Sequence, residues 1–162
     1  MTETTTTRSW LGLILAVGGC LLAGALGAWA TASSVTTWYP GIAKPAWTPP
    51  DAAFGPVWTA LYIMMGISAW LVWRRAGWNG GRGPLMLFAL QLVLNTTWSF
   101  LFFGLQRPGL AALEIVVLWL AIIATLIAFA RIDRLAGALL VPYLAWASFA
   151  CALNFTIWRM NA

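Results

Sequence analysis

The chain has 162 residues, of which 62% are hydrophobic and 8% are charged, a balance that excludes an ordinary soluble domain. Its net charge of +5 comes from nine basic and four acidic residues, without a basic run that could follow a phosphate backbone, so no nucleic-acid partner is expected. Histidine is absent, which excludes a haem iron held by histidine and argues against a zinc site and against ordinary acid–base catalysis.

Apolar segments of about 20 residues recur along the chain, and this is the length that crosses a hydrocarbon core of about 30 Å. They predict an all-α integral membrane protein, a five-transmembrane-helix bundle that forms one domain over residues 10–159. Residues 1–9 are polar and are predicted to be disordered. The predicted helices are 10–32, 54–73, 84–104, 109–130 and 135–157.

The first predicted helix carries small residues at Gly19, Ala23 and Gly27, four positions apart. Such a stripe lets another helix approach closely. The approaching helix can belong to the same chain or to a second copy of it, and the spacing alone is consistent with both arrangements.

The loop that follows, 33–53, is the least helical part of the chain. Pro40, Pro45, Pro49 and Pro50 exclude a continuous helix, because proline lacks a backbone donor and disfavours helix in the residue before it. The loop is therefore predicted to be a rigid aromatic lid over a pocket, or a segment whose rings anchor at headgroup level, and these two roles are compatible.

Two later helices contain residues that interrupt their apolar character. Pro142 is predicted to kink helix 135–157. Polar groups at membrane depth are costly unless they are paired, so those of helix 84–104 are expected to face other helices or a cavity. They are Gln91, Asn95, Thr96, Thr97 and Ser99.

The basic residues are unevenly divided between the two ends of the predicted bundle. Arg8, Arg74, Arg75, Arg82, Arg131 and Arg134 fall on the side of the N-terminus, and Lys44, Arg107 and Arg159 fall on the other. Because cytoplasmic loops are enriched in Lys and Arg, the N-terminus is predicted inside and the first loop outside.

Three predicted helices each present a face with aromatic rings and a few hydrogen-bonding groups, as the spacing of three or four residues shows. The residues are Trp58 and Tyr62, then Asn95 and Trp98, then Tyr143, Trp146, Ala150 and Asn154. Such faces suit a large planar ligand, because stacked rings add about 0.5–1.5 kcal/mol per pair beyond area burial. Packing of the rings against one another between helices is the alternative.

Several motifs spread over residues 10–159 together resemble the translocator protein / tryptophan-rich sensory protein family (TspO/MBR), of the bacterial type. The motifs are Trp38-Tyr39, Lys44-Pro45-Ala46-Trp47-Thr48-Pro49-Pro50, Val57-Trp58-Thr59-Ala60-Leu61-Tyr62, Asn95-Thr96-Thr97-Trp98-Ser99-Phe100, Pro142-Tyr143-Leu144-Ala145-Trp146 and Leu153-Asn154-Phe155. The resemblance implies a pocket beneath the first loop and a homodimer in many bacterial members.

The resemblance also implies ligands: porphyrins such as protoporphyrin IX, haem, sterols and benzodiazepine-type compounds. The porphyrin is bound as a ligand, with no cofactor required and no metal site expected. In the motif pattern Trp58 and Trp146 flank the porphyrin. The full candidate set is Trp38, Tyr39, Pro45, Trp47, Trp58, Tyr62, Asn95, Trp98, Tyr143, Trp146, Ala150 and Asn154.

The expected function is that of a membrane receptor or sensor that regulates tetrapyrrole metabolism. A tetrapyrrole transporter is one alternative, although no inverted repeat is visible. A light- and oxygen-dependent porphyrin-degrading enzyme is another. In that enzyme Trp58 and Trp146 would be redox partners of the excited porphyrin, and otherwise no catalytic residue is assigned. The sterol pattern at the end of helix 135–157 is incomplete, because Phe155 stands where a tyrosine is needed.

Overall fold

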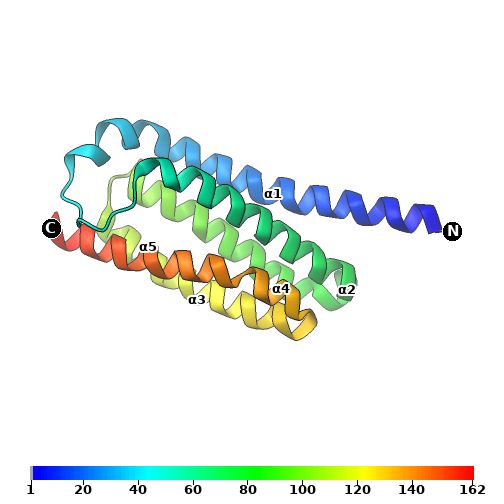
Figure 1. Cartoon of the computed structure of the whole chain (residues 1–162). Coiled ribbons are helices and arrows are strands. Elements are labelled where there is room, and N and C mark those ends of the chain that lie inside the picture. Colours follow the sequence, from blue (N-terminus) through cyan, green and yellow to red (C-terminus); the bar gives the residue numbers. More distant parts are fainter. Residues whose placement is uncertain (1) are drawn as a thin grey trace.

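The computed structural model of the protein describes residues 2–162, with side chains from residue 9 onward. Every regular element in this range is a helix, and the helices form one elongated bundle with the two termini at opposite ends (Figure 1). The elements are α1 (Thr2–Thr37), the 3₁₀ helix η1 (Tyr39–Gly41), α2 (Asp51–Ser99), the π-helix η2 (Phe100–Gly104), α3 (Pro108–Ile132), α4 (Arg134–Leu139) and α5 (Val141–Met160).

Within residues 2–162, four helical segments are long and apolar enough to cross a membrane, where the sequence predicted five. The difference lies in α2, which takes in both predicted helices 54–73 and 84–104 as one element of 49 residues. The segment predicted to be a flexible linker between them is largely helical. Helix extends on both sides of Gly77, and this glycine alone departs from helical backbone angles within the segment.

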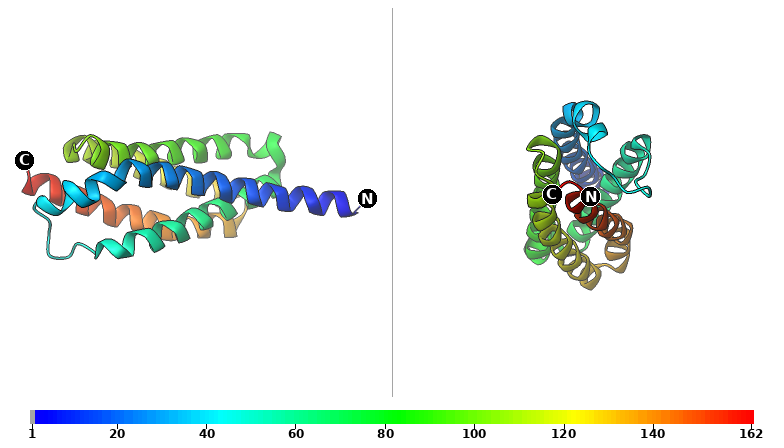
Figure 2. Two further views of the ribbon diagram at one scale, coloured as in Figure 1. Left: turned by 90° about the horizontal axis from the view of Figure 1, so that it is seen from above. Right: turned by 90° about the vertical axis from the view of Figure 1, so that its left-hand side faces the viewer.

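Gly77 folds α2 back on itself. Its backbone angles, φ 65° and ψ −170°, are non-helical and lie in a region that only glycine adopts at low cost. The resulting legs, 51–76 and 78–99, run back from the bend in opposite directions (Figure 1), and in the left view of Figure 2 they spread apart on either side of α1. The hydroxyl of Tyr62 donates to Oδ1 of Asn95 at 2.5 Å, across 33 residues of sequence. A straight helix would separate these two residues by about 50 Å.

Other boundaries also differ from the prediction. Helix α1 continues at both ends beyond 10–32, and it includes residues 2–9, because no proline interrupts the ladder from Thr2 to Thr37. The non-helical part of the first loop shrinks to residues 42–50, and η1 lies within the predicted loop. The predicted kink near Pro142 is a break between α4 and α5 at Leu140.

The outer surface of the bundle is apolar. Large aliphatic and aromatic side chains stand exposed on every long helix, among them Ile14, Val93, Leu113 and Val141. A water-soluble monomer rarely exposes so much contiguous apolar area, so this surface matches a hydrocarbon solvent.

Helix α1 packs against both legs of α2. A Cβ added at Gly24 would lie 2.5 Å from a ring carbon of Tyr62 on the first leg. One added at Gly27 would lie 3.2 Å from Oγ of Ser99, and Thr96 Oγ1 donates to the carbonyl of Ala23 at 3.5 Å. Two positions of the small-residue stripe, Ala23 and Gly27, thus serve packing within the chain. Gly19 has open space beside it.

The end of the bundle near Gly77 is held by an ion pair and a helix cap. Arg75 Nη1 lies 3.0 Å from Oδ2 of Asp133, and Oδ1 of Asp133 accepts from the N–H groups of Leu135 and Ala136 at the start of α4. The N–H of Ala136 and the guanidinium of Arg75 hold the pKa of Asp133 below its ordinary value. This contact ties the first leg of α2 to the turn between α3 and α4.

Candidate functional site

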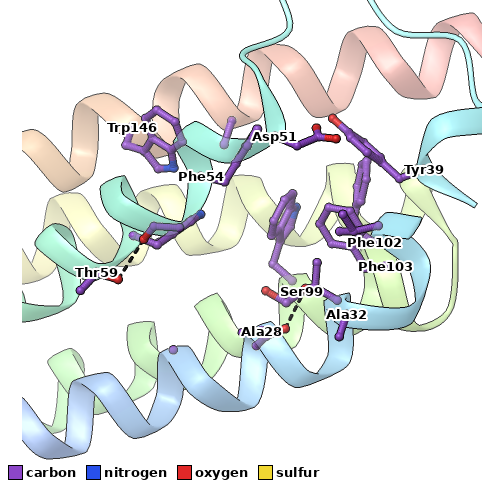
Figure 3. A pocket seen from close by; sticks show the side chains of 18 of the residues that line it. Ala28, Ala32, Tyr39, Asp51, Phe54, Thr59, Ser99, Phe102, Phe103 and Trp146 are labelled. Carbon is purple, nitrogen blue, oxygen red and sulfur yellow. Dashed lines mark hydrogen bonds between the residues drawn. The ribbon is translucent and has the colours of Figure 1, made fainter. Parts of the chain in front are cut away.

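A cavity of about 590 Å³ lies between α1, the two legs of α2, η2 and α5, at the end of the bundle covered by loop 42–50. This volume falls within the range of small-molecule sites. The lining is largely apolar, and it includes nine aromatic side chains from η1, α2, η2 and α5, several of which are labelled in Figure 3. They are Tyr39, Phe54, Trp58, Tyr62, Trp98, Phe102, Phe103, Trp146 and Phe149.

Trp58 and Trp146 form one aromatic corner of the cavity. Their ring centroids are 6.4 Å apart and their planes are nearly perpendicular, at 86°. Trp58 also stacks on Tyr62 at 5.5 Å, and Phe54 meets Trp146 edge-on at 5.8 Å. These rings hold one another in fixed orientations, so the corner is formed before any ligand arrives.

The π-helix η2 shapes the end of the cavity near the loop. Its wider turn places Phe102 and Phe103 against Tyr39, with Tyr39 at 6.4 Å and 5.5 Å from their respective centroids. Ser34 Oγ of α1 donates to the carbonyl of Phe103 at 2.6 Å, which satisfies a backbone acceptor at this turn. π-Helical turns are frequent at functional sites, and here the turn sets where two aromatic walls stand.

Hydrogen bonds fix the polar residues of the cavity wall. Tyr62 donates to Asn95, and Nδ2 of Asn95 lies 3.1 Å from the hydroxyl of Tyr143. Trp98 Nε1 donates to Oδ1 of Asn154 at 2.9 Å, and Nδ2 of Asn154 donates to a backbone carbonyl of α3. Because these groups are buried, losing a partner would leave a costly unsatisfied atom.

Loop 42–50 is fastened over this end of the bundle by the C-terminal segment. The side chain of Asn161 accepts from the N–H of Ala43 at 3.0 Å and donates to its carbonyl at 2.9 Å. Lys44 Nζ donates to the carbonyl of Tyr39 and lies 4.4 Å from the centroid of its ring. Trp47 meets Phe149 of α5 edge-on at 5.7 Å. The loop is therefore held at this end of the bundle, where Trp47 contacts Phe149 of the cavity lining.

The structure brings most of the predicted site residues to this cavity, but in two layers. The residues that line it are Tyr39, Trp58, Tyr62, Trp98, Trp146, Ala150 and Asn154. Those that do not line it are Trp38, Pro45, Trp47, Asn95 and Tyr143. Asn95 and Tyr143 act through Tyr62, and Trp38 supports Phe102 with centroids 5.8 Å apart.

One wall of the cavity contains none of the predicted site residues. It is formed by α1, whose contributing residues are Leu21, Gly24, Ala25, Gly27, Ala28, Thr31, Ala32 and Val35. The small residues on this helix are the sequence feature that marks the wall, but by themselves they predict only a helix-packing surface. Asp51 and the rings of η2 were missed because nothing in their spacing connects them to the other aromatic faces.

Comparison with known proteins places this arrangement in a family. Residues 16–159 match the TspO/MBR family. The chain is similar to the "Tryptophan-rich protein TspO" of Chlorobaculum tepidum, at 46% identity over 93% of this chain and 96% of the relative. It is also similar to the "Translocator protein" of Homo sapiens, at 41% identity over 76% of this chain and 75% of that protein.

A third similar protein is the "Tryptophan-rich sensory protein" of Cereibacter sphaeroides, at 42% identity over 76% of this chain and 77% of that protein. The match to the family covers every helix that lines the cavity, from α1 to α5. Together with the long apolar helices, it identifies an integral, multi-pass membrane protein. The chain belongs to the TspO/MBR family.

Proposed function

We propose that this protein is a membrane receptor or sensor that binds a tetrapyrrole, such as protoporphyrin IX or haem, in the cavity beneath loop 42–50 and thereby regulates tetrapyrrole metabolism. The supporting observation is the cavity itself, which has a volume of about 590 Å³ and is walled by aromatic rings from four elements. The word "sensory" in the name of the Cereibacter relative agrees with this role.

The geometry favours a large, flat, aromatic guest. The perpendicular rings of Trp58 and Trp146 offer one face and one edge to a planar ligand, and stacked or edge-on contacts add about 0.5–1.5 kcal/mol each. Ala150, one turn beyond Trp146, leaves room beside them. Sterol-like and benzodiazepine-type compounds are further candidates for the same cavity, and the ligand is bound without a resident cofactor.

In the proposed membrane arrangement each leg of α2 crosses the bilayer, so the chain crosses five times and its termini lie on opposite sides. Each leg exceeds the length needed for a hydrocarbon core of about 30 Å. The assembly is proposed to be a homodimer, with the N-terminus inside and loop 42–50 outside.

Equilibrium titration of the purified protein with protoporphyrin IX, in darkness, tests the proposal through quenching of tryptophan fluorescence. Saturable binding that Trp58→Ala and Trp146→Ala weaken at least tenfold is expected, because both rings line the cavity. Quenching that never saturates, or that both variants leave unchanged, would refute it.

The same samples separate the sensor from its alternatives. Under light and oxygen a sensor returns its porphyrin spectrum unchanged, whereas a degrading enzyme produces a new absorbing species that depends on Trp58. A transporter would move porphyrin across the membrane of sealed proteoliposomes. Flux or product in these assays would replace the sensor as the conclusion.

A further inference from the structure

Asp51 is the only side chain with a formal charge among the residues that line the cavity. It is the first residue of α2 and stands at the loop end of the cavity, where Figure 3 shows its carboxylate between Phe54 and Tyr39. The rest of the lining is apolar or carries neutral hydrogen-bonding groups. A ligand end that reaches the mouth of the cavity therefore meets a single negative charge.

Asp51 forms no ion pair with the described side chains. The only ion pair among side chains 9–162 joins Arg75 and Asp133, at the opposite end of the bundle. Position 51 is also where a negative charge is favoured, because the first turn of a helix carries a partial positive charge. Burial raises the pKa of Tyr39, and the charge of Asp51 raises it further, which agrees with an unpaired carboxylate close to this ring.

The basic residue of loop 42–50 is engaged with Tyr39. Lys44 donates to the carbonyl of Tyr39 and covers the face of its ring, and Lys44 is not part of the cavity lining. Arg107 and Arg159 lie on the exposed surface at this end and do not line the cavity either. These cations attract anions toward this end of the molecule, while the exposed carboxylate of Asp51 at the mouth repels them.

We infer that Asp51 is a specificity-determining residue of the cavity. It disfavours flat ligands that place a negative charge at the mouth of the cavity. It favours flat ligands whose end at the mouth is neutral or cationic. The inference rests on the proposed function, because it concerns the ligand class of the same cavity. It assigns to Asp51 a selective role in binding, separate from the aromatic residues that provide affinity.

The competing explanation is that Asp51 only stabilises the start of α2 through the helix dipole. Loss of that role would weaken the fold and would lower the affinity for every ligand by the same factor. A ratio of affinities for two ligands that differ only in charge therefore separates the two explanations.

Protoporphyrin IX and its dimethyl ester supply this ratio, since the ring is the same and only the diacid carries two carboxylates. Binding of each is measured with the full chain in phosphatidylcholine nanodiscs, against empty nanodiscs as the reference for partition into lipid. Asp51→Asn should raise the affinity for the diacid relative to the ester by about 2- to 5-fold, the range for a charge pair exposed to solvent.

Two variants serve as controls. Asp51→Glu retains the charge and should keep the wild-type ratio. Glu3→Gln removes one negative charge from the opposite end of the chain and should also keep it. An unchanged ratio in Asp51→Asn, or the same shift in Glu3→Gln, would overturn the inference while the proposed function stands. If neither porphyrin binds the wild-type protein saturably, the proposed function and the inference both fail.

Discussion

At the scale of single residues, the candidate site separates side chains that can touch a ligand from side chains that hold them in place. Ala150 and Trp146 line the cavity one turn apart on α5, whereas Asn95 reaches it only through the hydroxyl of Tyr62. A change at Asn95 should thus act mainly on stability, since it would leave the buried hydroxyls of Tyr62 and Tyr143 without their common partner.

Enlarging Ala150 should reduce porphyrin binding. A side chain that intrudes on a fitted site typically costs about 1–3 kcal/mol, which is roughly a 5- to 150-fold loss of affinity. Ala150→Thr should weaken protoporphyrin binding within this range, Ala150→Phe should nearly abolish it, and Trp146→Phe should be milder than either. Affinity and melting temperature are measured on the same preparations.

Ala152 offers a matched control on the same helix, because it is exposed and does not line the cavity. Ala152→Phe should bind protoporphyrin normally. A folded Ala150→Phe protein with native affinity would remove this face of α5 from the binding site. Lower melting temperature with normal affinity would instead assign Ala150 to helix packing.

At the scale of elements, two short segments decide the geometry of the site. Gly77 turns α2 back on itself, so that the leg carrying Tyr62 and the leg carrying Asn95 become neighbours. Loop 42–50 is fastened to the C-terminal segment by Asn161, which uses both ends of its amide on the backbone of Ala43. The bend at Gly77 brings together the residues that line the cavity, and the Asn161 contacts fix loop 42–50 at the same end of the bundle as the cavity.

Gly77→Ala should destabilise the fold, because a Cβ is disfavoured at φ 65° and ψ −170° by about 1–3 kcal/mol. Chemical unfolding in detergent, followed by helix content, measures the loss. Gly83→Ala is the matched control, because a Cβ at Gly83 would meet no other side chain or packed element within 4 Å and its φ is not positive. This substitution should leave stability unchanged or raise it slightly. Equal stability of the two variants would show that the bend tolerates a side chain.

Asn161→Ala should loosen the lid. The two hydrogen bonds to Ala43 are exposed, so their loss is expected to cost at most about 1 kcal/mol and to speed porphyrin dissociation about 3- to 5-fold. Stopped-flow displacement measures the dissociation rate. Asn79→Ala, an exposed position beside the bend of α2, should leave the rate unchanged. An unaltered rate in Asn161→Ala would mean that loop 42–50 does not control ligand exit.

At the scale of the whole molecule, the two ends of the bundle differ in basic charge. Arg74, Arg75, Arg82, Arg131 and Arg134 gather at the end of the Gly77 bend, and Lys44, Arg107 and Arg159 lie at the end of the lid. From the positive-inside rule we predict that the cavity faces the outer side of the membrane.

Cysteine labelling tests this orientation. In a background without Cys20 and Cys151, cysteines at Thr4 and at Ala46 are exposed in intact cells to a maleimide that cannot cross the membrane. We expect labelling at position 46 and protection at position 4, with both labelled after the cells are permeabilised. The reverse pattern would invert the topology.

Much of the architecture could be read from local sequence. Hydropathy identifies apolar helices because a membrane requires every backbone group to be satisfied within the segment. Proline marks the interruptions at loop 42–50 and near Pro142 because it lacks a donor. Spacing of three or four residues placed Trp58 with Tyr62, and Trp146 with Ala150, on single faces.

The tertiary structure alone decided which of these faces meet. Periodicity orients a side chain about its own helix axis, but it carries no information on the neighbouring helix. Hence Asn95 was placed in the lining although it stands behind Tyr62, and the wall made by α1 was not foreseen. Likewise the fastening of Ala43 by Asn161 joins residues 118 positions apart, and Asp51 reaches the cavity mouth only because the lid and α2 converge there.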